Sequence, residues 1–231
     1  MNDYLLFIDT EASGLPKNWN LPYNTPGNWP FCVQIAWLIY TKEGKKIKAE
    51  NHYIKNDDFT IAGSAIKIHG ITKEFLNGKG EYRKDVLKLL TDDVNKYTPL
   101  VAGHFMQFDL HMLGADFFRE GMVDPIKKEA TFCTMLGSTS LIKNPSLKYL
   151  RLEQLYSTLF NKTLENHHNA FVDASATASC FFELMKRGEI NEEIILGQQK
   201  NILKKHKVHE KEGCVIPMLM IILLTVLICY L

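Results

Sequence analysis

YLLFIDTEASGLP (residues 4–16) joins an apolar run to two closely spaced acids and a turn. Tyr4–Asp9 is short, apolar and ends in an acid, a pattern typical of a strand buried inside a sheet. Asp9 and Glu11 stand at positions i and i+2, so on an extended chain both side chains point to one face. Two carboxylates held so close repel each other, and a bound cation relieves that repulsion. We expect a metal site at this strand end, although an isolated D-x-E is more often solvated surface.

Strand-like and helix-like patterns then follow along the chain. The other expected strands are Phe31–Tyr40, Ile47–Lys55 and Leu100–Gly103, the first two joined by a turn at Glu43-Gly44. The expected helices are Glu81–Val94, Phe108–Arg119, Leu152–Phe160 and Ala170–Lys186. An early meander of strands followed by strand–helix alternation predicts an α/β domain with a mixed central sheet flanked by helices.

Two later segments place ionisable side chains where chemistry needs them. Asp109 has apolar neighbours in sequence, Phe108 and Leu110, and a charge in such company needs a partner or an ion. It can also be a first-turn aspartate that interacts with the helix dipole. His168 precedes the last expected helix and Asp173 lies in its opening turns. An imidazole beside a fixed carboxylate suits a general base next to a metal ligand, whereas a lone histidine there is more often a cap or surface residue.

Taken together and in this order, three segments resemble the DEDDh exonuclease family. They are FIDTEASGLP (7–16), GHFMQFDL (103–110) and HHNAFVDASATA (167–178). That family includes the proofreading exonuclease subunits of bacterial DNA polymerases, ribonuclease T and the mammalian three-prime repair exonucleases. The resemblance covers residues 4 to about 187. It implies a ribonuclease H-like fold, a 3′→5′ exonuclease and a role in DNA repair or proofreading.

The resemblance also implies the parts of the active site. Asp9, Glu11 and Asp173 would hold one divalent metal, Asp9 would bridge to a second, and Asp109 would support the second. All these ligands are hard oxygens, so two Mg²⁺ or Mn²⁺ ions are implied. His168 would be the general base of a two-metal hydrolysis that releases nucleoside 5′-monophosphates.

Further residues are implied on the substrate side. Ile68-His69-Gly70-Ile71-Thr72 resembles the family's substrate-side turn. Leu15 and Ile68 are candidates to wedge against the terminal bases, and stacking of this kind tolerates any sequence. The full set of implied substrate-binding residues is Thr10, Ala12, Leu15, Ile68, His69 and His104. Phe105 departs from the family, which usually has Asn after this histidine; that puts an orienting role of the position in doubt, but not Asp109.

A loop rich in proline and aromatic residues follows the first motif. PKNWNLPYNTPGNWPF (16–31) carries Trp19, Tyr23 and Trp29, and it begins five residues after Glu11. It therefore lies near the expected metal site. Two interpretations stay open: a small aromatic core pinned under the domain, or a lid that stacks on bases of the incoming strand.

Charge and cysteine content limit the partners. The 231 residues hold 27 Lys and Arg against 26 Asp and Glu, a net charge of +1. This balance argues against a wide basic grip on long nucleic acid, but it allows a pocket for a few nucleotides at one single-stranded 3′ end. The five cysteines have spacings that fit neither a zinc module nor paired disulfides, which indicates reduced thiols in the cytosol.

The last 17 residues, 215–231, contain no charge. As a helix they would span roughly 26 Å, at the short edge of bilayer-crossing length, with Pro217 tolerated in the first turn. Five lysines between residues 200 and 211 precede them. We therefore expect an exonuclease domain (1–188), a polar connector (189–214) and a single-pass C-terminal membrane anchor (215–231), with the large domain on the cytoplasmic face and no signal peptide. The alternative is a hydrophobic helix docked on the domain or on a partner.

The leading hypothesis is thus an exonuclease that acts on single-stranded nucleic acid 3′ ends, DNA before RNA. A second hypothesis is a nuclease-fold module that binds nucleic acid without cleaving it; that would require a broken acid or histidine, and all five candidates are intact. A third is a membrane-assembly subunit whose nuclease serves a protein partner. A homodimer is compatible with each of them.

Overall fold

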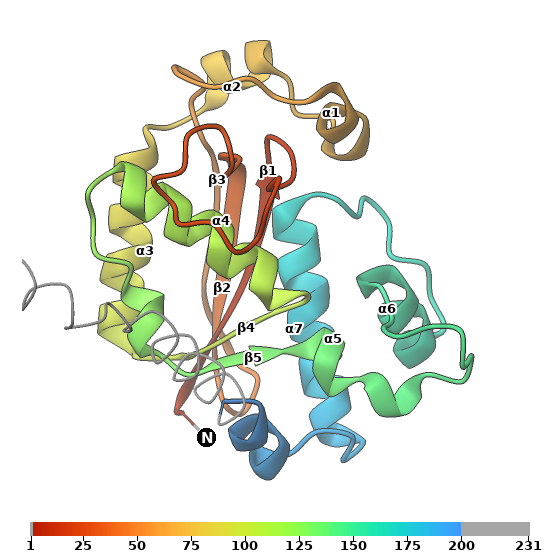
Figure 1. Cartoon of the computed structure of the whole chain (residues 1–231). Coiled ribbons are helices and arrows are strands. Elements are labelled where there is room, and N and C mark those ends of the chain that lie inside the picture. Colours follow the sequence, from red (N-terminus) through yellow and green to blue (C-terminus); the bar gives the residue numbers. More distant parts are fainter. Residues whose placement is uncertain (1, 200–231) are drawn as a thin grey trace, which may run out of the picture. The chain divides into compact units, whose positions relative to one another are not determined.

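A five-stranded mixed sheet, ordered β3-β2-β1-β4-β5, forms the centre of the computed structural model, which describes residues 2–199 (Figure 1). The strands are β1 (Tyr4–Ala12), β2 (Cys32–Thr41), β3 (Lys46–Tyr53), β4 (Leu100–Gly103) and β5 (Thr131–Cys133). The pairs β1–β2 and β2–β3 are antiparallel, and the pairs β1–β4 and β4–β5 are parallel. The predicted α/β fold with a mixed central sheet is confirmed.

Helices fill the connections between and after the strands. The α-helices are α1 (Gly63–His69), α2 (Lys73–Lys79), α3 (Arg83–Tyr97), α4 (Met106–Arg119), α5 (Thr134–Gly137), α6 (Leu152–Phe160) and α7 (Ala170–Lys186). Two 3₁₀ turns are η1 (Pro125–Lys128) and η2 (Thr139–Leu141). The four predicted helices are confirmed. The sequence patterns missed α1, α2, α5 and β5, because elements of three to seven residues are too short to show a period.

Element ends differ from the predicted ones by up to three residues, and one difference matters for the site. β1 continues past Asp9 to Ala12, because Thr10 pairs with Ile35 and Glu11 with Gln34 of β2. Glu11 therefore belongs to the sheet and not to the turn after it.

The alternation of side chains along β1 divides the core in two. Leu6 and Ile8 belong to a cluster that includes the apolar residues of α3 and α4. Leu5 and Phe7 belong to a second cluster with α6 and α7 (Figure 1). Both faces of β1 are covered, so the strand reads as a continuous apolar run and not as an alternating one.

The compact unit that contains the sheet, Met1–Ile195, extends beyond the predicted domain end at residue 188. Ile190 and Ile195 are buried in the α6–α7 cluster, which explains the extension. Residues 192–199 are helical. The remainder of the predicted connector and the predicted membrane segment 215–231 lie outside the described residues.

Across residues 2–199, no helix has the length and apolar character needed to cross a membrane.

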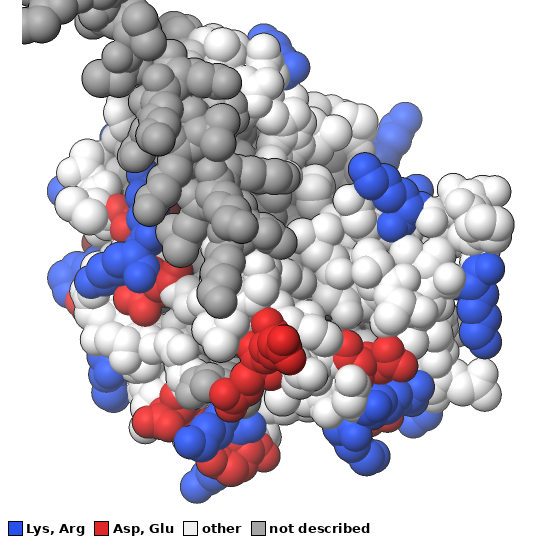
Figure 2. Space-filling view, turned by 60° about the horizontal axis from the view of Figure 1, so that its bottom comes forward, with Lys and Arg blue, Asp and Glu red and all other residues white. Residues whose placement is uncertain are grey.

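The surface carries both signs of charge. On the described part of the face in Figure 2, basic and acidic side chains are intermixed in small patches. This distribution agrees with the net charge of +1.

Candidate active site

The end of β1 supplies side chains to both faces of the sheet. Asp9 and Glu11 follow Leu5 and Phe7 in the alternation, so they point toward α7. Thr10 points the other way, toward α4, and is buried. The ladder with β2 shifts register between Glu11 and Ala12, an irregularity of the kind that re-aims side chains beside active sites. The predicted sharing of one face by the two acids is confirmed.

Asp109 reaches the site from the first turn of α4. β4 runs parallel to β1, so the chain that leaves β4 enters α4 beside the end of β1. The Thr10 hydroxyl donates a hydrogen bond to Asp109 Oδ1 at 2.8 Å, and Asp109 is 2% exposed. Gly103 leaves room where the chain turns from β4 into α4, because a Cβ there would lie 2.8 Å from Met106 Sδ and 3.3 Å from the Ile8 carbonyl oxygen.

The start of α7 brings in His168 and Asp173. The Asn169 side chain caps the helix by accepting hydrogen bonds from the backbone N–H groups of its first turn. Gln34, fully buried and paired with Glu11 across the sheet, accepts a hydrogen bond from the Ala170 backbone N–H at 3.2 Å. The His168 backbone N–H donates to Asp173 Oδ2 at 2.9 Å. These bonds fix the helix start relative to β1 and leave the His168 ring exposed.

Burial raises the pKa values of all four acids, and repulsion by neighbouring carboxylates of the site adds to this effect at Asp9, Glu11 and Asp109. Burial first, then the charges of Asp109, Asp173 and Glu11, raises the pKa of Asp9 well above its usual range. The pKa of Glu11 is raised to about 8, mainly by burial and then by Asp173. Burial likewise raises the pKa of Asp109 to about 7 and that of Asp173 to about 6. Four carboxylates this close cannot all be charged at neutral pH without a cation to balance them.

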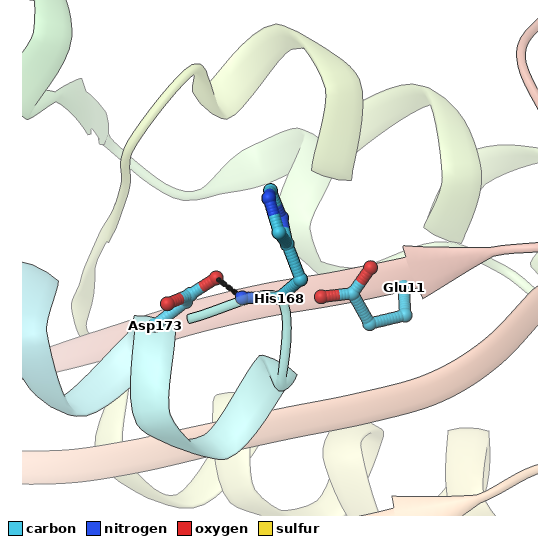
Figure 3. A group of neighbouring side chains, drawn as sticks. All are labelled: Glu11, His168 and Asp173. Atoms are coloured by element: carbon cyan, nitrogen blue, oxygen red, sulfur yellow. Dashed lines mark hydrogen bonds between the residues drawn. The ribbon is translucent and has the colours of Figure 1, made fainter. Parts of the chain in front are cut away.

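The donor set fits a divalent cation. The ligand atoms of Glu11, His168 and Asp173 all lie within 4.8 Å of one another, and Figure 3 shows the three side chains together. Asp173 Oδ1 is buried and has no hydrogen-bond partner among the described residues, as expected for an oxygen that binds an ion. Carboxylate oxygens are the ligands that Mg²⁺ and Mn²⁺ prefer. Desolvation and the neighbouring His167 lower the pKa of His168, so its imidazole is neutral and free to accept a proton at neutral pH.

Comparison with known proteins identifies the family. Residues 6–181 match the family model RNase_T, described as Exonuclease. The chain belongs to this exonuclease family. None of the curated proteins matches this chain by sequence.

Solved structures show the same fold. E. coli exonuclease I in complex with a dT13 oligonucleotide is 20% identical, with a TM-score of 0.64 over 80% of this chain and 41% of that one. The zinc-bound E. coli exonuclease I complex with single-stranded DNA is 19% identical, with a TM-score of 0.67 over 91% of this chain and 45% of that one. Exonuclease I from Methylocaldum szegediense is 20% identical, with a TM-score of 0.63 over 80% and 40%. The chain thus spans less than half the length of the exonuclease I chains that it matches.

The residues predicted on the substrate side fall into two groups. Leu15 and Ile68 are 76% and 56% exposed, so their side chains are available for contact. Thr10 and Ala12 are buried. His69 engages the chain with both ring nitrogens: Nδ1 accepts from the Ile71 N–H at 2.9 Å, and Nε2 lies 3.3 Å from the Ala12 carbonyl. Contact of these residues with substrate stays a prediction.

Both ring nitrogens of His104 are also engaged within the protein. Its Nδ1 lies 3.0 Å from Thr134 Oγ1, and its Nε2 lies 3.0 Å from the Leu150 carbonyl oxygen. Burial lowers its pKa to about 4, so the ring is neutral. His104 therefore ties the end of β4 to two later segments, and its predicted contact with substrate is untested.

The aromatic loop (16–31) matches the small-core interpretation drawn from its sequence, and the lid interpretation stays a prediction. Trp29 is 4% exposed and stacks on His111, with ring centroids 4.8 Å apart. Tyr23 Oη lies 3.1 Å from His111 Nδ1. These residues form the small aromatic core. Trp19 is half-buried and packs both against this core, with its ring 5.7 Å from that of His111, and toward Phe105 at the start of α4.

Sequence reasoning missed some residues that shape the site. Asn169 had a readable signal, since Asn directly before a helix is a typical N-cap. Gln34 had none, because a glutamine inside an apolar strand does not indicate which distant backbone group it will meet.

Phe105 occupies the N-cap position of α4 with left-handed backbone angles (φ 62°, ψ 43°), which cost a bulky residue on the order of 1–3 kcal/mol. Asn, the usual family residue there, tolerates that conformation.

Proposed function

We propose that this exonuclease hydrolyses single-stranded nucleic acid from the 3′ end to nucleoside 5′-monophosphates, with DNA favoured over RNA. One observation carries the proposal: four carboxylates from β1, α4 and α7 converge beside an exposed, neutral histidine. The exonuclease I structures that share the fold hold single-stranded DNA, which supports the substrate class.

Two divalent cations, Mg²⁺ or Mn²⁺, fit the donor set. Asp9, Glu11 and Asp173 would hold one ion, and Asp9 with Asp109 would hold the other. Such ions supply electrophilic activation of the phosphate and lower the pKa of water. The raised pKa values of the acids and the unpartnered Asp173 Oδ1 support this assignment.

The chain's own residues then account for the proton transfer and for positioning. His168 accepts a proton from the attacking water, whose oxygen forms the new bond to the terminal phosphorus. The bond between that phosphorus and the 3′-oxygen of the preceding nucleotide breaks, and this oxygen leaves with the shortened strand and takes up a proton. Leu15 and Ile68, both exposed, would pack against the terminal bases and hold the phosphate in place.

The test is product analysis with matched substrates. Full-length protein with Mg²⁺ or Mn²⁺ should convert 5′-labelled single-stranded DNA into a descending ladder and release 5′-mononucleotides, and EDTA should stop the reaction. An RNA oligonucleotide of the same sequence should be degraded more slowly. Cleavage of a circular single strand at a comparable rate would show an endonuclease and contradict the proposal.

We further propose that residues 215–231 anchor the exonuclease to a membrane, with its large domain on the cytoplasmic face. The absence of charge in this segment and the five lysines between residues 200 and 211 support this proposal. Anionic lipid would attract those lysines by about 1 kcal/mol each near the surface.

A further inference from the structure

Phe105 presents an aromatic ring at the start of α4, the helix that carries Asp109. Its side chain is 41% exposed, although its backbone is left-handed, a conformation that few residues other than Gly and Asn adopt. It precedes Asp109 by four positions, about one helical turn or 6 Å of rise. Residues with strained backbone angles cluster at functional sites, where the side chain contributes to binding or catalysis.

Other aromatic rings support Phe105. The Phe105 ring lies 6.0 Å from the Trp19 ring and 6.4 Å from the Phe108 ring, with Phe105 and Phe108 nearly parallel at 16°. Trp19 is in turn held by His111, with centroids 5.7 Å apart at 72°. The Phe105 ring therefore has aromatic neighbours that hold it in place while part of its surface stays open to solvent.

A groove that shares Trp19 with this cluster lies beside α4. It has a volume of about 500 Å³ and is lined by aromatic side chains, of which Tyr23 and Phe118 are partly or largely exposed, and by the loop residues 20–22 and 24. Lys127 Nζ lies 5.9 Å from the centre of the Tyr23 ring and brings a positive charge to the groove. Aromatic faces with a nearby cation are the surface that unpaired nucleotides bind.

We propose that Phe105, supported by Trp19 and Phe108, stacks on an unpaired base next to the nucleotide being removed, and that the groove receives the strand beyond it. The proposal rests on the proposed exonuclease function and extends it. Stacking requires a free base face, and the bases of a duplex already cover theirs. This aromatic platform, the Phe105 ring supported by Trp19 and Phe108, would therefore favour single strands of any sequence.

The experiment places 2-aminopurine, whose fluorescence is quenched by stacking, at each of the last six positions of a single-stranded DNA oligonucleotide. Full-length protein carrying His168→Ala, in Mn²⁺, allows binding to be measured without appreciable turnover. Quenching should peak at one position near the 3′ end. Phe105→Asn should abolish that peak and weaken binding roughly 5- to 100-fold, the range found when a base-stacking ring is removed. Phe105→Tyr should preserve both.

Phe75→Asn is the matched control, since Phe75 is also 41% exposed but lies on α2, packed edge-on against Tyr53. It should leave the quenching peak and the affinity unchanged. With His168 intact, Phe105→Asn should raise KM by the same factor with kcat within about threefold. Its melting temperature should not fall, because Asn tolerates the left-handed backbone.

A protein without position-dependent quenching, or a Phe105→Asn variant that binds and quenches like its parent, would overturn the platform. Failure of the proposed function would look different: no nucleotide would be released by the unmodified chain with Mg²⁺ or Mn²⁺. The quenching measurement decides the platform in that case too, because it needs binding and not cleavage.

Discussion

His168 differs from the four acids of the site in being exposed and in having a lowered pKa. Because its imidazole can accept a proton at neutral pH, we expect His168→Ala to lower kcat by roughly 10²–10⁴-fold while Mn²⁺ still binds to the acids. Single-turnover kinetics and calorimetric titration of Mn²⁺ would measure the two effects separately.

His167 provides the control for this prediction. Its ring lies 4.4 Å from that of His168, yet it has no place in the proposed chemistry. His167→Ala should keep kcat within about threefold. It should move the acid limb of the pH–rate profile to higher pH, because one of the charges that lower the His168 pKa is gone. A His168→Ala protein with full activity would remove the general-base role.

The four acids predict an unusual pH dependence of stability without metal. Their pKa values, raised to about 6 for Asp173, 7 for Asp109 and 8 for Glu11, lie above the usual 3.8–4.5, so the folded state binds more protons than the unfolded state. The free energy of unfolding should therefore fall as pH rises from about 4 to 8, by an amount on the order of a few kcal/mol. Thermal melts in EDTA would show this as a loss of roughly 5–10 °C.

Removing one acid tests whether repulsion between the carboxylates causes this pH dependence of stability. Asp9→Asn takes away one repelling charge, so the metal-free variant should melt above the parent protein at pH 8. The parent should be stabilised by Mn²⁺, and more strongly at pH 8 than at pH 5, because the ion competes with protons. A metal-free parent whose melting temperature is constant from pH 5 to 8 would contradict the electrostatic account.

At the level of elements, the aromatic loop and α4 depend on one glycine. A Cβ at Gly114 would lie 2.6 Å from Tyr23 Oη, so the loop can pack against the helix only because no side chain intervenes. We expect Gly114→Ala to destabilise the protein by about 1–3 kcal/mol, although alanine is the better helix former. Urea unfolding of the purified protein would measure the change.

Gly78 in α2 is the matched control, because an added Cβ there meets nothing within 4 Å. Gly78→Ala should be neutral or stabilise by up to about 1 kcal/mol. In a Tyr23→Ala background the cost of Gly114→Ala should disappear, since the clash is gone. Additive effects of the two substitutions would show that the glycine has another role.

At the level of the whole molecule, the charge-free segment 215–231 is the part whose removal tests membrane attachment. Deleting residues 215–231 should move the protein from the membrane fraction to the soluble fraction, with activity on short oligonucleotides within about twofold of the full chain. The connector before the segment is long enough for the catalytic domain to act independently. Fractionation with high-salt and alkaline washes would measure attachment.

The full-length protein is the reference for that deletion. Its attachment to the membrane should survive both washes, because burial of apolar side chains in lipid is insensitive to salt whereas lysine–lipid attraction is not. Full-length protein that stays in the soluble fraction would show that the segment is covered by protein.

The amino-acid sequence alone predicts the fold class, and its motifs propose the ionisable residues of the site. The YLLFID run indicated a central strand, and the period-2 geometry of a strand put Asp9 and Glu11 on one face. Helical periodicity located α4, α6 and α7, and motif order connected Asp109, His168 and Asp173 to the same family. These inferences succeed because they depend on local geometry and on the chemistry of single side chains.

How those residues meet depends on the three-dimensional fold. Parallel pairing of β4 with β1 puts Asp109 within reach of Thr10. On β2, Gln34 holds the start of α7 by accepting a hydrogen bond from the Ala170 backbone N–H. Trp19 and Phe105, 86 positions apart, become neighbours on one surface. The physical reason is that buried hydrogen bonds and ring contacts form between segments brought together by the sheet, and no local pattern records which partner each will find.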